Sequence, residues 1–439
     1  MTWKSISEYS TGAKLNGYAR VLRKRNMGAI SFWRARFNNE TVQLMLVRDQ
    51  LVDYVQVKKI VPGSIVYVKG EKFITQTGEA TLLIKEIEEK ISCNWIMPEK
   101  FHGISQERRY RQRVLDLICN DDAFYFMRFT TQVTSDIRKL LWEEGFQEFN
   151  TGVLQEYFEG GQAEPFRTHC QANGKDLYLS LTSELKLKRL IIAGFERVFE
   201  IAQSFRNEGI SPFHSPEFTL LEVYAQECNC HDMMDVAESI VRRVSDSYLS
   251  GRNGKKPKQD NKIIPISFEG PYKRVPFEEA YAQYAGSFSD CNLASLVLNY
   301  PEMFHSGMSK FTWVMKVIEK MIVPKIIEPT FLTELPIGLS PLVKVCEKNS
   351  AVTDRAFFVA NGIFFADIYS DENDPVKVGA SLEAQSRETG RPVNEDYLSL
   401  LEYGLPPTAG IGLSLNRLFM VFLEELPKNI KETICYPLL

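Results

Sequence analysis

The residues best suited to do chemistry in this sequence lie at positions 199–224, FEIAQSFRNEGISPFHSPEFTLLEVY. The pattern predicts a strand, a polar turn at 207–216 that contains Gly and Pro, and a second strand. Side chains alternate between the faces of a strand, so one face would carry a guanidinium, carboxylates, a ring and a phenol. Burying that much charge is costly unless a ligand pairs with it; a ladder of internal salt bridges is the alternative. The side chains expected on this face are Ser204, Arg206, Glu208, Phe218, Leu220, Glu222 and Tyr224.

The string FRNEG…H.PEFT.LE.Y resembles motif 2 of the class II aminoacyl-tRNA synthetases, and most of all the lysyl-tRNA synthetase subgroup. The resemblance implies that Arg206 holds the α-phosphate of ATP. A guanidinium suits this task because its donors form a rigid fork. It also implies that Glu208 recognises adenine, that Phe218 stacks on it, and that His214 belongs to the ATP site.

Two segments resemble the amino-acid-binding parts of the same family. EGGQAEPF at 159–166 resembles the turn PGGA.ARPF, whose glycines admit the substrate amino group, here Gly160 and Gly161. LYLSLTSELKLKRL at 177–190 resembles LYLRIAPELYLKRL, which aligns Glu184 with the carboxylate that binds the α-ammonium.

The other end of the pocket is expected at Glu222 and Tyr224, which the resemblance places at the ammonium of the substrate side chain. Carboxylates at opposite ends suit a long diamine such as lysine, because a buried ammonium must be paired. The alternative for Glu184 is a plain ion pair with Lys186 or Lys188.

Residues 402–422, EYGLPPTAGIGLSLNRLFMVF, resemble motif 3 of the family. Their pattern predicts a strand, a Gly-rich turn and a helix. The resemblance implies that Arg417 covers adenine and reaches the γ-phosphate, so Arg206 and Arg417 are the expected catalytic cations. Glycines here would let the backbone approach a ligand closely. The family's GIGIDR reads GLSLNR, with Ser414 for Gly and Asn416 for Asp.

The segment RAFFVANGIFFADIYSDENDP at 355–375 departs most from the family pattern FELF.NG.ELANGFSELNDP. The two acidic residues that bind Mg²⁺ in the family fall on Phe357 and Phe364, and phenyl rings cannot ligate Mg²⁺. The family's Asn and its side-chain-binding Glu fall on Asp367 and Asp371, which are candidates to replace the lost ligands. The amino-acid-binding residues expected from this segment are Asp367, Tyr369 and Asp371.

Two other positions also depart from the family: Phe213 replaces a basic residue, and Gly338 replaces a Glu. Together with the phenylalanines, Phe213 removes charge complementarity from the triphosphate end. Loss of one preorganised electrostatic element typically costs about 3–4 kcal/mol, or ~10²–10³ in rate. Two hypotheses follow. The chain is an ATP- and Mg²⁺-dependent lysine–tRNA ligase, or it is a paralogue with impaired adenylation that binds tRNA or an amino acid, or transfers an aminoacyl group to another acceptor.

The elements that position these residues are preceded by a β-rich stretch at 13–93. Short alternating segments separated by turns predict a five-stranded barrel of the oligonucleotide-binding type. Its basic run RVLRKR at 20–25 would suit phosphate contacts, although a solvated charge run is the alternative. KRNMGAISF and TGEATLLIKEI resemble the lysyl-type anticodon-binding segments, which implies that tRNA is read by Arg25, Phe32, Gln43 and Glu79.

The fold class expected is therefore α+β, with an N-terminal barrel at 1–94, a linker at 95–112 and a class II catalytic domain at 113–439. The last is built on an antiparallel sheet flanked by helices. Motifs 1, 2 and 3 are expected at about 130–155, 196–226 and 402–425 by resemblance. Motif 1 implies a homodimer, although Gly152 replaces its proline and thereby relaxes the chain direction.

The composition is ordinary for a globular protein. Of the 439 residues, 44% are hydrophobic and 25% charged, and the net charge is −4, so nucleic-acid binding must rest on local basic patches. The sequence predicts neither a signal peptide nor a membrane-spanning run, which favours a cytoplasmic location. The eight cysteines are scattered, and Cys228, Cys230 and His231 lack a second half of a zinc site, so no metal site is expected.

Overall fold

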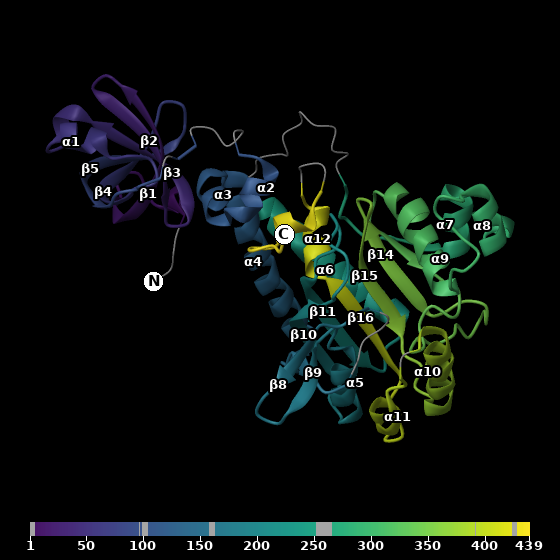
Figure 1. Cartoon of the computed structure of the whole chain (residues 1–439). Coiled ribbons are helices and arrows are strands. Elements are labelled where there is room, and N and C mark those ends of the chain that lie inside the picture. The colour runs from purple at the N-terminus through teal and green to yellow at the C-terminus, as the bar shows by residue number, and fades with distance from the viewer. Residues whose placement is uncertain are drawn as a thin grey trace. The chain divides into compact units, whose positions relative to one another are not determined.

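The computed structural model describes residues 5–95, 97–98, 104–157, 163–251, 266–390, 392–423 and 428–439. The chain divides into two compact units, residues 1–126 and 127–438 (Figure 1). The domain limits expected from the sequence, with a linker at 95–112, stay a prediction.

The first unit contains a closed barrel of five strands in the order β1-β2-β3-β5-β4. The strands alternate inward and outward, so that Trp33 and Ala35 of β2 are fully buried between exposed or half-buried neighbours. The inward side chains form one hydrophobic core inside the barrel. The predicted five-stranded barrel is confirmed. The elements are β1 (Lys14–Met27), β2 (Ile30–Phe37), β3 (Glu40–Val47), α1 (Tyr54–Lys59), β4 (Ile65–Ile74) and β5 (Ala80–Ile91).

Two short helices follow the barrel, α2 (Gln106–Arg111) and α3 (Arg113–Cys119), and the long α4 (Asp121–Glu143) comes next. The carboxylate of Asp116 is fully buried between Arg109 and Arg113, at 3.0 and 2.6 Å. Asp116 of α3 and Arg109 of α2 hold the two helices in one arrangement, because separating them would leave a buried charge without its partner.

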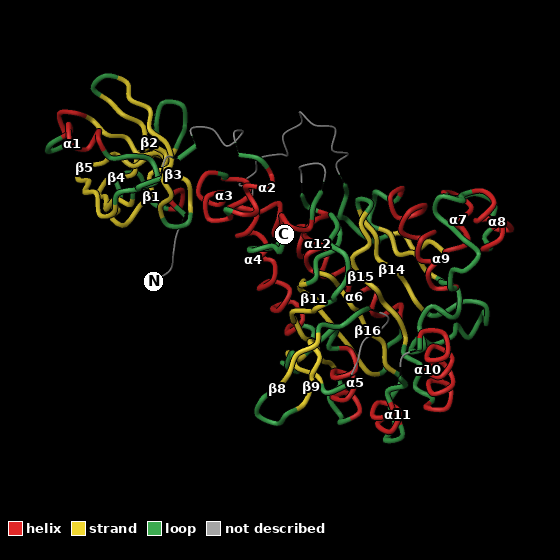
Figure 2. Tube along the Cα trace, in the orientation of Figure 1, coloured by secondary structure: helices red, strands yellow, loops and turns green. Residues whose placement is uncertain are grey.

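The second unit is built on an eight-stranded sheet in the order β12-β13-β14-β15-β16-β11-β10-β6, drawn in yellow in Figure 2. The β12–β13 and β10–β6 pairs are parallel and the others antiparallel, which confirms the antiparallel-rich sheet. The strands are β6 (Gln147–Glu148), β10 (Arg197–Phe205), β11 (Glu217–Gln226), β12 (Lys273–Pro276), β13 (Thr330–Thr333), β14 (Arg355–Ala360), β15 (Ile363–Ser370) and β16 (Thr408–Ser414).

Helices flank this sheet, and a small sheet of order β7-β9-β8 lies beside it (Figure 1). Two hydrophobic clusters join helices to strands, one around β13 and β14 and one around α5 and β11. The bounds are β7 (Leu154–Gln155), β8 (Arg167–Cys170), β9 (Lys175–Leu179), α5 (Glu184–Ile192), α6 (Cys230–Gly251), α7 (Phe277–Tyr284), α8 (Leu293–Asn299), α9 (Lys310–Lys316), α10 (Pro375–Thr389), α11 (Glu395–Leu401) and α12 (Leu415–Val421). Within the described residues, no helix is long and apolar enough to cross a membrane.

Candidate active site

The hairpin expected from the sequence is formed by β10 and β11, which pair antiparallel with Ser204 opposite Phe218 and Glu200 opposite Glu222. One detail of the prediction is wrong: β10 ends at Phe205, so Arg206 and Glu208 lie in the turn. The backbone N–H of Arg206 still donates to Pro216 O at 2.8 Å, which extends the pairing by one residue and fixes the start of its side chain.

The guanidinium of Arg206 lies over the ring of Phe218, with 5.1 Å from its carbon to the ring centroid. Its Nε is buried and has no hydrogen-bond partner within the described part of the chain. Burial lowers the pKa of Arg206, while the charges of Glu208 and Glu222 oppose that shift. A buried guanidinium with a free donor is suited to an anionic ligand, which would supply the missing hydrogen bond.

Arg417 begins its side chain on α12 and donates to two backbone carbonyls, Phe213 O and Phe364 O, both at 3.3 Å. His214 contacts Ser211 Oγ through Nδ1 at 2.8 Å. Burial, followed by the charges of Arg417 and Arg206, lowers the pKa of His214 to about 4, so its ring is neutral at pH 7. Arg206, His214 and Arg417, all expected in the ATP site, are thus near enough to influence one another electrostatically.

Glu222 is buried on β11 and is held by two hydroxyl donors. Thr182 Oγ1 donates to Oε1 and Tyr224 OH donates to Oε2, the latter at 2.9 Å. Burial, and next the charge of Glu184, raise the pKa of Glu222 to about 8. A ligand ammonium placed here would reverse that shift, since an opposite charge favours the ionised form.

Replacing Glu222 with Gln is expected to flatten the pH dependence of folding stability. With a folded-state pKa of about 8, the native carboxyl keeps a proton that the unfolded chain has already lost above its ordinary value of about 4.3. The free energy of unfolding therefore falls as pH rises from about 5 to 8, by about 1.4 kcal/mol per pH unit for one proton. Urea denaturation across this range measures the slope, and an equal slope in Glu222→Gln would contradict the assignment.

The glycines of β16 make room for the side chains of β11. Gly410 is opposite Tyr224 and Gly412 is opposite Glu222 in the strand register. A Cβ on Gly410 would lie 2.2 Å from the ring of Tyr224, and one on Gly412 would lie 3.4 Å from Glu222 Oε2. These glycines therefore make room for side chains of the neighbouring strand, and their expected role in letting the backbone approach a ligand stays a prediction.

Lys188 is a pocket residue that sequence reasoning weighed only as an alternative partner for Glu184. Its Nζ is buried, 2.6 Å from Glu184 Oε1 and 2.5 Å from Asp371 Oδ1. The rings of Tyr224 and Tyr369 lie 5.3 and 5.2 Å from the same atom. Glu184 thus forms the ion pair with Lys188, and its role in binding the α-ammonium of a ligand stays a prediction.

Three titratable groups of this cluster, Lys188, Glu184 and Asp371, shift one another's pKa values. Burial alone would lower the pKa of Lys188, but Asp371 and Glu184 hold it well above its ordinary value. Burial opposes ionisation of Glu184, yet the charge of Lys188 and its hydrogen bond lower the pKa of Glu184. Burial raises the pKa of Asp371 to about 7 against the pull of Lys188.

The two expected replacement ligands for a metal are both paired with cations of this chain. Asp371 contacts Lys188, and Asp367 accepts from Arg355 Nε at 2.8 Å and from its Nη2 at 2.5 Å. Tyr369 OH donates to Glu184 Oε1, which ties β15 to α5. Arg355 and Thr182 were not identified from the sequence, because contacts between segments distant in the sequence bring them to Asp367 and Glu222.

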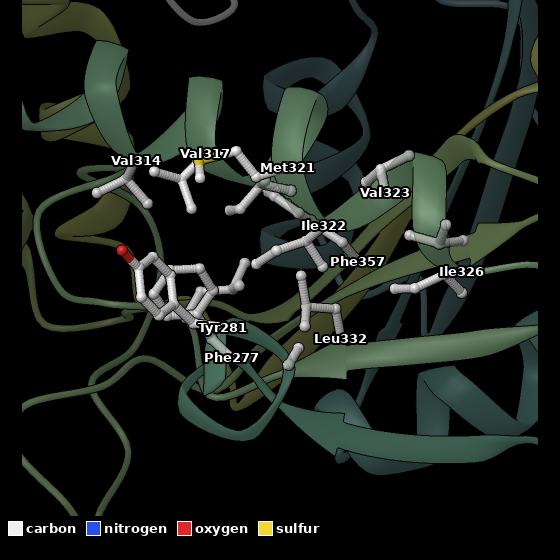
Figure 3. Close-up of a cluster of buried hydrophobic side chains, with 14 of the residues drawn as sticks. Phe277, Tyr281, Val314, Val317, Met321, Ile322, Val323, Ile326, Leu332 and Phe357 are labelled. Atoms are coloured by element: carbon white, nitrogen blue, oxygen red, sulfur yellow. The ribbon is translucent and has the colours of Figure 1, made fainter. Parts of the chain in front are cut away.

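Phe357 and Phe364, at the positions where the family resemblance expects acidic metal ligands, pack against each other with centroids 4.4 Å apart. Phe357 is only 1% exposed and belongs to a cluster with Ile322 and Leu332, as Figure 3 shows. Among the described residues, no three His, Cys, Asp or Glu side chains gather as a metal site. Neither phenylalanine side chain offers the oxygen ligand that Mg²⁺ requires.

The expected anticodon residues lie on the outer surface of the barrel or on its turns. Arg25 pairs across the ladder with Phe32, and Gln43 donates to Thr81 Oγ1 at 3.0 Å, next to the turn that carries Glu79. The strand pattern leaves Phe32 and Gln43 half-buried and Arg25 and Glu79 exposed.

Two cations of the expected basic run are used inside the barrel unit: Arg20 donates to Gly63 O, and Lys24 donates to Lys58 O and Ile60 O at the end of α1. The expected amino-group turn with Gly160 and Gly161 lies outside the described residues. Gly152 has φ +79°, which Pro cannot adopt, so the proline expected there would not fit this chain path.

Comparison with known proteins agrees with this arrangement. The model of the family "tRNA synthetases class II (D, K and N)" matches residues 105–439. The chain is 34% identical to the lysine–tRNA ligase of Coxiella burnetii (strain Dugway 5J108-111), over 96% of this chain and 86% of that protein. It is 35% identical to the one of Dehalococcoides mccartyi (strain CBDB1) and 33% to that of Pectobacterium atrosepticum, covering 96% and 97% of this chain and 86% of each relative. The chain belongs to the class II tRNA synthetases of the D, K and N group, and is lysyl-tRNA synthetase-like over nearly its whole length.

Proposed function

We propose that this protein activates lysine, or a lysine-like amino acid, with ATP and transfers the aminoacyl group to tRNA. One observation carries the proposal: the half-buried Glu184 of α5 and the buried Glu222 of β11 are close enough for the charge of one to act on the other, and Glu222 shares its hairpin with the Arg206–Phe218 pair. The identities of 33–35% to lysine–tRNA ligases support the choice of amino acid.

The ATP end of the site would work by positioning and charge stabilisation, without a side-chain base. Arg206 would bind the α-phosphate, because its buried Nε lacks a partner within the described residues. Phe218 would stack on adenine, Glu208 would recognise it, and His214 and Arg417 would complete the site. Lysine would enter with one ammonium at Glu184 and the other at Glu222 and Tyr224.

The barrel is proposed to bind the anticodon of tRNA. Replacing Phe32 with Ala should lower kcat/KM for tRNA charging by about 10–100-fold, because stacking of one base contributes about 1–3 kcal/mol. Amino-acid activation without tRNA should keep its rate. Tyr18→Ala is the control, since Tyr18 is a different surface ring of the barrel, at 63% exposure. Equal losses in the two variants would contradict the assignment of Phe32.

A homodimer is also proposed, by resemblance of α4 and β6 to motif 1. Exposed apolar side chains near these elements support a partner surface: Trp142, Val153 and Leu154. Light scattering of the purified chain reads the mass directly, and a monomer at micromolar concentration would contradict the proposal. The proposed location is the cytoplasm.

A second candidate function rests on Phe357 and Phe364. We propose that the Mg²⁺ ligands of the family are lost, because these rings pack together and both candidate replacements, Asp367 and Asp371, are paired with Arg355 and Lys188. Adenylation would then be impaired. The protein would act as a binder of tRNA or amino acid, or as an aminoacyl transferase to another acceptor.

One experiment separates the two functions. The protein is mixed with lysine, ATP, Mg²⁺ and labelled pyrophosphate, and label appearing in ATP is measured. Lysine-dependent exchange supports the ligase. Absence of exchange while tRNA still binds supports the second function. If neither exchange nor tRNA binding is found, both proposed functions are contradicted.

A further inference from the structure

We infer that the nucleotide end of this site binds a nucleoside monophosphate group, as AMP or AMP esterified to an amino acid, without a divalent cation and in preference to ATP with Mg²⁺. The inference rests on the proposed function only in taking adenine as the base. The protein groups that surround Arg206 determine how many phosphate charges the site can neutralise.

The site has one well-prepared position for a phosphate, at Arg206. The guanidinium lies over the ring of Phe218, with its carbon 5.1 Å from the ring centroid. Its buried Nε has no hydrogen-bond partner within the described residues. A single phosphate oxygen would satisfy that donor and neutralise the charge. Forked binding of this kind needs no metal ion.

Three acidic side chains of the site are engaged by groups of the chain itself, whereas a fourth, the exposed Glu208, acts on Arg206 through its charge. Asp367 is bound by Arg355 through two contacts, Asp371 by Lys188, and Glu222 by two hydroxyls. Glu319 is a further carboxylate, and its charge acts on Arg417. One such group cannot supply the near-octahedral oxygen set that Mg²⁺ requires together with phosphates.

Beyond Arg206 the surroundings disfavour two further phosphates. The Arg417 guanidinium carbon lies 6.0 Å from the centroid of the Phe364 ring, and two of its three nitrogens, Nε and Nη1, already donate to the carbonyls of Phe213 and Phe364. His214 is neutral at pH 7 because its pKa is lowered to about 4. Phosphates placed against Phe364 would lose water without gaining equivalent partners, which is costly for charged groups.

The test measures binding of AMP and ATP to the full chain by calorimetry, each with Mg²⁺ and with EDTA. We expect AMP to bind at least as tightly as ATP, and Mg²⁺ to change the affinity for ATP by less than about 3-fold. If ATP with Mg²⁺ binds more than about 10-fold tighter than AMP, or than ATP in EDTA, the inference is wrong. Failure of both nucleotides to bind also overturns it.

Phe364→Glu tests the cause at a half-buried position, so the hydrophobic cluster around Phe357 is kept. This variant should gain a Mg²⁺-dependent increase in ATP affinity of about 10-fold, whereas the size-matched Phe364→Leu should gain none. A Mg²⁺ dependence equal in the wild type and both variants would contradict the role of Phe364. The outcomes are independent of pyrophosphate exchange: metal-free AMP binding without exchange leaves the inference standing while the ligase function fails.

Discussion

Replacing Arg206 with Met is expected to lower lysine-dependent pyrophosphate exchange by about 10²–10³-fold, the usual effect of removing one preorganised donor at a reacting charge. The reason is structural: the guanidinium is buried over Phe218 with an unsatisfied Nε, so its charge serves the ligand rather than the fold. AMP affinity should fall with it. Steady-state exchange at saturating lysine and calorimetry with AMP measure the two effects.

The folded state should tolerate this change. Because no described carboxylate accepts from the Arg206 guanidinium, Arg206→Met removes a buried charge that lacks a hydrogen-bonded partner, and the melting temperature should stay the same or rise. Arg206→Lys is the informative control: it keeps the charge but loses the fork, so it should recover only part of the activity. A Met variant that melts early and keeps its activity would assign Arg206 to the fold instead.

Much of this molecule follows from local sequence patterns. Period-two alternation predicted the strands of the barrel, because Trp33 and Ala35 face inward on either side of the exposed Arg34. The same period placed Phe218 and Glu222 on one face of β11. Where the chain leaves the strand, the pattern fails: the turn after Phe205 carries Arg206, and alternation says nothing about turn geometry.

The unpredicted features depend on contacts between distant segments. Lys188 lies on α5 and Asp371 directly follows β15, so their contact depends on the tertiary fold, and neither segment of the sequence predicts the other. Gly410 is small because the ring of Tyr224 lies against it, which requires the register of β16 with β11. Phe357 could be predicted as a missing ligand by resemblance, but its place in a hydrophobic cluster follows only from the packing of Ile322 and Leu332.

Replacing Lys188 with Met is expected to lower the free energy of unfolding by about 3–5 kcal/mol at pH 7, the usual cost of removing one partner of a buried ion pair. The ammonium is fully buried between Glu184 and Asp371, and the variant leaves these carboxylates close together without a cation. The pKa of Lys188 is raised, so its contribution is complete at neutral pH and is lost only as pH rises through that higher value. Urea denaturation at pH 7 measures the change.

A second substitution decides whether charge or packing is responsible. In Lys188→Met with Asp371→Asn, one of the two stranded carboxylates becomes neutral, so the double variant should be more stable than Lys188→Met alone. If packing of the lysine stem were the main effect, the added Asn would bring no recovery. Recovery of stability without recovery of lysine binding would mean that the resident ammonium also positions Glu184 for the ligand, because Tyr369 and Lys188 are the donors that hold its Oε1.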